Sequence, residues 1–163
     1  MNRFLIALLL CGIFLIFPFQ VYIIGNETGI GIEGALYRYQ VTGYGNSLIP
    51  VTSDIMYVAN GIYSGKTALS IILWALGTVL LTFTTIFGLI FAFTERSDYL
   101  QQIFLGILGS CCCYIASCIA QYGFFFHGPA GVSIPIGIFL LVVWIIIGTR
   151  YPELLLFLKE DNF

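Results

Sequence analysis

Four stretches of this chain contain no Asp, Glu, Lys, Arg or His, and they constrain its fold more than any other feature. They cover residues 4–24, 67–94, 99–126 and 132–149. About 20 apolar residues are needed to cross the roughly 30 Å hydrocarbon core of a bilayer as a helix. A helix also satisfies its own backbone hydrogen bonds in lipid. The pattern therefore predicts an all-α membrane protein, built as a bundle of four transmembrane helices.

The composition supports lipid as the main solvent of this chain. Only 9% of the 163 residues are charged and 60% are hydrophobic, whereas a soluble domain carries roughly 25% charged residues. So few charges cannot cover a water-facing surface, and we expect one integral membrane domain over residues 1–163. The net charge is -2, with no run of Lys or Arg. Nucleic acid, whose phosphates are bound by clustered basic residues, is therefore not an expected partner.

Basic residues beside the apolar stretches predict the topology. With the N-terminus inside, the inner side holds four of them and the outer side two, namely Arg3, Arg96, Arg150 and Lys159 against Arg38 and Lys66. Because basic residues are enriched in cytoplasmic flanks, both termini are expected to be cytoplasmic in a multi-pass protein of the cell membrane. The first stretch is longer than the apolar region of a signal peptide, so we expect it to remain uncleaved. The outer loop then covers residues 25–66, the inner loop 95–98 and the cytoplasmic tail 150–163.

The long outer loop has its own structural signals. Residues 36–41 favour a strand through their Tyr and Val content, and Gly-Tyr-Gly-Asn at 43–46 reads as a turn. A second strand is expected over residues 47–52, where Pro50 would lie at a sheet edge. Ser-Asp at 53–54 resembles the N-cap of a short helix. The loop therefore predicts a small extracellular β-hairpin or sheet followed by a short helix.

Groups able to carry chemistry are scarce, so no catalytic residue, cofactor site or metal site is expected. The single histidine, His127, falls in a loop, which excludes a haem held by two histidines of one chain. The apolar stretches hold no ionisable residue, whereas proton-coupled transporters usually carry such residues within the membrane. The five cysteines lie in apolar stretches without a CxxC pair, and buried cysteine packs as a small hydrophobe. We do not expect an enzyme.

A ridge of small residues in the third stretch predicts close helix packing. Gly109, Cys113 and Ser117 recur every fourth residue, and Gly106 and Ser110 run alongside. Small residues let two helix backbones approach closely, and such packing drives association in lipid. The helix that meets this ridge lies either in the same chain or in a partner.

Uncharged polar residues in the apolar stretches point to bundle packing. Gln20 and Gln121 would share an outer layer if the first and third helices were neighbours, and hydrogen bonds between such groups add modest stability. Thr78, Thr82 and Thr85 share one face of the second stretch. That face is the main polar lining that a homo-oligomeric pore could use.

Three short segments carry a resemblance to a known family. Residues 32–37 read Ile-Glu-Gly-Ala-Leu-Tyr, Lys66 closes the long loop, and Gly-Pro-Ala at 128–130 precedes the fourth stretch. With the order of the helices and loops, they resemble the claudin and peripheral-myelin-protein superfamily, which has a Gly-Leu-Trp motif, a basic residue and a Gly-Pro-like start at these places. Tyr37 replaces the tryptophan of that motif, and the family's pair of loop cysteines is absent. The resemblance implies a left-handed bundle with an outer sheet used for lateral or face-to-face contacts.

These observations favour a non-enzymatic structural or assembly protein whose first outer loop mediates protein contacts. Its partners would be the lipid bilayer and either copies of itself or another membrane or cell-envelope protein. Tyrosine is enriched at recognition surfaces because it offers a large contact and a polar end. The candidate contact residues in the loop are Tyr37, Arg38, Tyr39, Tyr44 and Tyr57. Two alternatives stay open: an accessory subunit of a larger membrane enzyme or transporter, and a homo-oligomeric pore.

Overall fold

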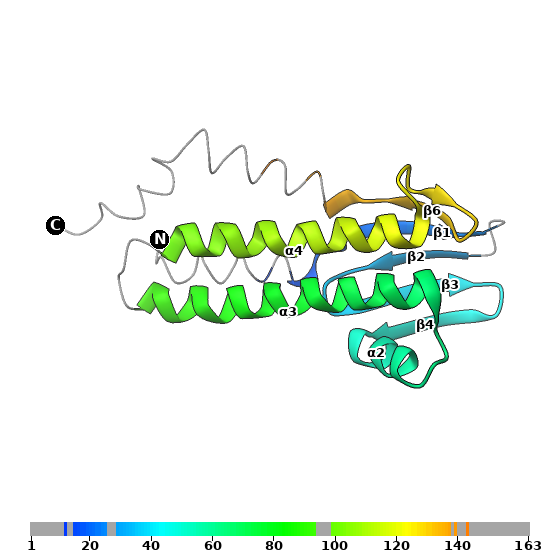
Figure 1. Ribbon diagram of the computed structural model, residues 1–163, viewed down its shortest axis with the longest axis horizontal. Coiled ribbons are helices and arrows are strands. Elements are labelled where there is room, and N and C mark those ends of the chain that lie inside the picture. The colour runs from blue at the N-terminus through cyan, green and yellow to red at the C-terminus, as the bar shows by residue number, and fades with distance from the viewer. Residues whose placement is uncertain are drawn as a thin grey trace.

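The described part of the chain folds into two layers, an antiparallel sheet and a pair of long helices packed against one side of it (Figure 1). The computed structural model describes residue 12 and residues 15–25, 29–93, 99–137, 139 and 143. The strands are β1 (Gln20–Ile24), β2 (Gly29–Glu33), β3 (Tyr37–Thr42), β4 (Gly45–Pro50), β5 (His127–Gly128) and β6 (Gly131–Ile134). The helices are α2 (Val51–Ala59), α3 (Gly65–Phe93) and α4 (Tyr99–Tyr122).

The six strands form one sheet in the order β4-β3-β2-β1-β6-β5, and every neighbouring pair is antiparallel. Strands β1 to β4 follow one another along the chain as a meander. Strand β6 comes from the other end of the sequence and pairs with β1, so that Ile23 lies opposite Val132. The sheet therefore joins the segment before the long loop to the segment after α4.

The prediction of an all-α, four-helix bundle is wrong. A six-stranded sheet is present, and among the described residues only α3 and α4 are long and apolar enough to cross a membrane. Strand β1 occupies the end of the first predicted helix, 4–24, and β6 occupies the start of the fourth, 132–149. Short apolar runs cannot be assigned to helix or strand by periodicity. At 20–24 the β-branched and aromatic residues favour the strand.

Helices α3 and α4 lie in the ranges expected for the second and third membrane crossings. Their apolar spans are Gly65–Ile90 and Leu105–Tyr122. Helix α4 ends four residues earlier than predicted because Gly123 adopts a left-handed backbone with φ 87° and its N–H bonds the carbonyl of Ile119, a common way to end a helix. Helix α2 begins after Pro50, not at the expected N-cap of 53–54. The predicted inner loop, 95–98, and tail, 150–163, lie outside the described residues.

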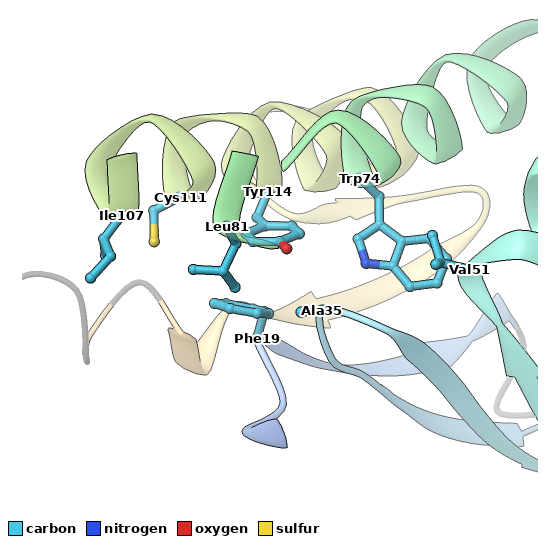
Figure 2. Close-up of a cluster of buried hydrophobic side chains, with 8 residues drawn as sticks. All are labelled: Phe19, Ala35, Val51, Trp74, Leu81, Ile107, Cys111 and Tyr114. Atoms are coloured by element: carbon cyan, nitrogen blue, oxygen red, sulfur yellow. The ribbon is translucent and has the colours of Figure 1, made fainter. Parts of the chain in front are cut away.

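The core lies between the sheet and the two long helices (Figure 2). The rings of Phe19 and Tyr114 stack with their centroids 4.2 Å apart. Trp74 is almost fully buried, and its Nε1–H donates to the carbonyl of Gly34 at 2.9 Å. Thr78 Oγ1 donates to the carbonyl of Ala35 at 2.5 Å. These two hydrogen bonds satisfy the backbone carbonyls of the turn between β2 and β3 and hold that turn against α3.

The small-residue ridge of α4 faces α3 at four of its five predicted positions. Ser117 and Ser70 bond reciprocally, each hydroxyl donating to the other residue's carbonyl at 2.8 and 3.0 Å. A Cβ added at Gly77 would meet Cys113 Cβ and the carbonyl of Ser110, both at 3.1 Å. A Cβ added at Gly106 would overlap Thr84, whereas one added at Gly109 would meet nothing within 4 Å. The ridge therefore packs within the chain, and Gly109 lies beside it.

Two glycine substitutions test this interface with a matched control. We expect Gly106→Ala to lower the free energy of unfolding by about 1–3 kcal/mol because the new methyl overlaps Thr84 in a packed contact. We expect Gly109→Ala to leave it unchanged or to raise it by up to about 1 kcal/mol, since alanine is the better helix former. Thermal unfolding in detergent measures both. Equal effects of the two substitutions would contradict the assignment of the interface.

Candidate functional site

The two faces of the sheet have the reverse of the usual polarity. The face that packs on α3 and α4 carries polar residues, including buried Gln20 and Ser133 and the ion pair of Arg38. The face that points away from the helices carries aliphatic residues. In most antiparallel sheets the apolar face is buried and the polar face is solvated. An exposed apolar face is therefore the feature of this fold that calls for a function.

One row of the exposed face crosses four strands in register. Val132, Ile23, Ile30 and Val41 lie directly opposite one another on β6, β1, β2 and β3. Their side chains are 36%, 37%, 51% and 38% exposed. Directly opposite side chains on one face lie about 5 Å apart, so the four form a continuous aliphatic strip.

A second row lies two residues along each strand on the same face. It consists of Ile134, Val21, Ile32, Tyr39 and Leu48 in register. Ile134 and Leu48 are exposed, and the three between them are partly buried. We call these nine residues of the two rows the outer face. It carries no charged side chain, and at its margins lie Asn46 and His127.

The inner face is held by a polar network centred on Gln20. Gln20 Nε2 donates to Glu33 Oε2 at 2.5 Å, and its Oε1 accepts from Ser133 Oγ at 2.7 Å and from Cys118 Sγ at 2.8 Å. One side chain thus joins β1 to β2, β6 and α4. Tyr22 lies beside this network, and its ring packs over Gly31, where a larger side chain would overlap it.

An ion pair continues the network towards α2. Arg38 donates to Asp54 Oδ1 at 2.7 Å, and the Asp54 side chain is fully buried. Burial raises the pKa of Glu33 to about 7, although Arg38 and the hydrogen bond from Gln20 act in the opposite direction. Burial also raises the pKa of Asp54, against the effect of Arg38. The inner face therefore holds one cation and two carboxyl groups, with Glu33 titrating near neutral pH.

A small cavity of about 20 Å³ lies within this network, between the sheet and the two long helices. Its polar lining includes Gln20, Glu33, Arg38, Ser70 and Gln121. Gln121 Oε1 and Arg38 Nε are buried without a hydrogen-bond partner. A cavity of this size can hold one water molecule, and such a water could bridge the unpaired atoms. This arrangement suits a structural network better than a ligand pocket, which needs several hundred cubic ångströms.

The predicted contact residues separate into different surroundings. Tyr39 lies on the outer face, and the Tyr37 hydroxyl on the same side of the sheet donates to the carbonyl of Ile16 at 3.1 Å. Arg38 points the other way, into the inner network. Tyr44 is fully exposed at the β3–β4 turn, and Tyr57 in α2 packs edge-on against Tyr63. The tyrosines therefore do not gather into one surface.

The outer face was missed from the sequence because its residues on β1 and β6 lay in expected helices and those on β2 lay in glycine-rich sequence, although Val41 and Leu48 lay in expected strands. Val21, Ile23, Val132 and Ile134 alternate with polar or aromatic residues over short runs, which is the signal that could have found them. Gln20 and Gln121, expected to share an outer layer, do line one cavity, although Gln20 lies in a strand.

Comparison with known proteins gives no relative to guide the assignment: no family model, curated protein or solved structure matches this chain.

Among the described residues, no group of three or more His, Cys, Asp or Glu side chains is placed to hold a metal ion. The three threonine hydroxyls considered for a pore, at 78, 82 and 85, all donate to backbone carbonyls. The outer face is therefore the best candidate functional site.

The raised pKa of Glu33 predicts a stability change with pH. The folded state holds a proton on Glu33 up to about pH 7, whereas the unfolded chain releases it near the ordinary value of 4.5. Because the folded state binds the extra proton, the free energy of unfolding falls as pH rises through this window. We expect Glu33→Gln, which keeps an acceptor for Gln20, to flatten that fall in unfolding measured at pH 5 and pH 8. An equally steep fall in the variant would contradict the assignment to Glu33, since Asp54 is retained in both chains.

Proposed function

We propose that this chain is a non-enzymatic membrane assembly protein whose sheet makes lateral contacts with other proteins. The outer face is the observation that supports the proposal. Six of its aliphatic side chains are 36–66% exposed. Together they form a patch at roughly the 300–600 Å² scale of the largest apolar patches on monomers, which are often functional.

The proposal places α3 and α4 in the bilayer and the sheet at its outer surface. With 29 residues, α3 is about 43 Å long, which exceeds the roughly 30 Å hydrocarbon core. The sheet packs against the end of the pair that contains Gly65 and Tyr122, and its strands reach past the helix ends (Figure 1). The proposal keeps the orientation expected from the basic residues, with this end of the helix pair on the outside.

The position of the outer face relative to the bilayer surface favours another protein, not lipid, as the partner that buries it. Tyr22 and Tyr122, the last residue of α4, have ring centroids 6.4 Å apart. Ile23 follows Tyr22 along β1, away from the helices, and Ile30 lies opposite it. If α4 ends at the bilayer surface, the row containing Ile23 and Ile30 lies outside the hydrocarbon. There, burial against another protein would remove its apolar surface from water.

The resemblance to the claudin superfamily remains part of this proposal. It implies an outer sheet followed by a short helix and used for lateral contacts. Strands β1 to β4 followed by α2 are in keeping with that order. Strand β6 extends the sheet with residues that had been expected to form a helix.

The mass of the native particle tests the proposal. After gentle detergent extraction we expect the native chain in a particle with at least one further protein chain. Ile30→Lys should weaken that association by at least about a hundredfold, because it puts an unpaired charge into an apolar contact. Ile62→Lys is the matched control, since Ile62 is 63% exposed but lies between α2 and α3, away from the sheet. A native chain that is extracted alone in its micelle would contradict the proposal.

A further inference from the structure

We propose that the outer face packs against the outer face of a second copy of this chain, about a twofold axis along the bilayer normal. This inference rests on the proposed function and names its partner. Two aliphatic sheet faces would then stack as in a β-sandwich, about 10 Å apart.

The direction of the strands permits this pairing within one bilayer. Strands β1 to β4 run parallel to the long axes of α3 and α4 (Figure 1). If those helices cross the membrane, the outer face stands upright and points sideways, away from its own helices. A twofold axis along the normal then brings two such faces together and leaves both helix pairs in the same membrane, on opposite sides of the contact.

The charge distribution suits self-association. In a twofold contact each patch meets a copy of itself, so a charged patch would place like charges together and repel. The ion pair of Arg38 with Asp54 and the carboxyl of Glu33 all lie on the inner face. The outer face carries no charge, and its aliphatic rows are complementary to themselves.

The dimensions of the face are large enough for a small specific contact. Six strands at ordinary spacing make the sheet about 24 Å wide, and five-residue strands make it about 17 Å tall. A face of this size covers about 400 Å² in projection, and its pleat and side chains bring the accessible surface to several hundred Å² per partner, at the lower end of the range for specific interfaces. The two edge strands of the sheet offer less surface and fewer hydrogen-bonding groups for a contact. Strand β5 has two residues, and β4 ends at Pro50, which lacks an N–H donor.

Cysteine crosslinking in native membranes tests the partner. The centre of the face lies between Ile23 and Ile30, so two copies of Ile30→Cys should lie within reach of a bismaleimide with a spacer of about 10 Å. The background replaces Cys11, Cys112 and Cys113 by serine and keeps Cys111 and Cys118, which are buried. We expect an adduct of twice the chain mass that contains only this chain.

Leu48→Cys is the geometric control. Leu48 lies on the same face and is more exposed than Ile30, at 66% against 51%. It lies on β4, two strands from the centre of the face, so two copies would be more than about 20 Å apart at ordinary strand spacing. We therefore expect little adduct from it.

The outcomes separate this inference from the proposed function. Equal adducts at Ile30→Cys and Leu48→Cys would indicate random collision and would overturn the twofold arrangement. An Ile30→Cys adduct with an unlike chain would overturn the second copy as partner but keep the assembly role. Labelling of Ile30→Cys by a lipid-linked maleimide, with no protein adduct, would overturn both.

Discussion

The fold depends on the hydrogen bonds of Gln20. This side chain donates to Glu33 and accepts from Ser133 and Cys118, so it ties three strands of the sheet to α4 at one point. A buried amide left unpaired would cost about 1–3 kcal/mol, and a one-residue slip in register would move every side chain of a strand to the opposite face. The network therefore specifies which face of the sheet packs on the helices. Because that face is the polar one, the aliphatic residues are left outside.

The anchoring makes the sheet a rigid extension of the helix pair. Trp74 and Thr78 of α3 bond the β2–β3 turn, and Ser70 and Ser117 lock α3 to α4. The outer face is therefore presented at a fixed height and direction relative to the two apolar spans. A preorganised surface loses little conformational entropy when it binds. This rigidity suits a protein that assembles laterally better than one that must change shape around a ligand.

The sequence predicted the parts of the fold that depend on long patterns. The charge-free runs located α3 and α4, and the Gly-Tyr-Gly-Asn segment fell at the β3–β4 turn. Strands β1 and β6 were not predicted, because a charge-free run of four or five residues beside a longer one reads as more of the same helix. The direction of the Arg38 side chain was also not predicted. Its place between two tyrosines suggested a contact surface, whereas the side chain points to the inner face and pairs with Asp54, sixteen residues later. Contacts between residues distant in sequence decided both points.

The pairing of β1 with β6 is the central claim, since it brings Ser133 to Gln20 and extends both rows of the outer face onto β6. The most direct test is intrachain crosslinking of cysteine pairs by a short thiol reagent in the cysteine-reduced background described above. Ile23→Cys should link to Val132→Cys, which lies directly opposite on the same face. It should not link to Ser133→Cys, whose side chain points to the opposite face. Efficient linkage of the first pair alone is the predicted result. Failure of the first pair, or equal linkage of both, would contradict the sheet and return these segments to helices or to another register.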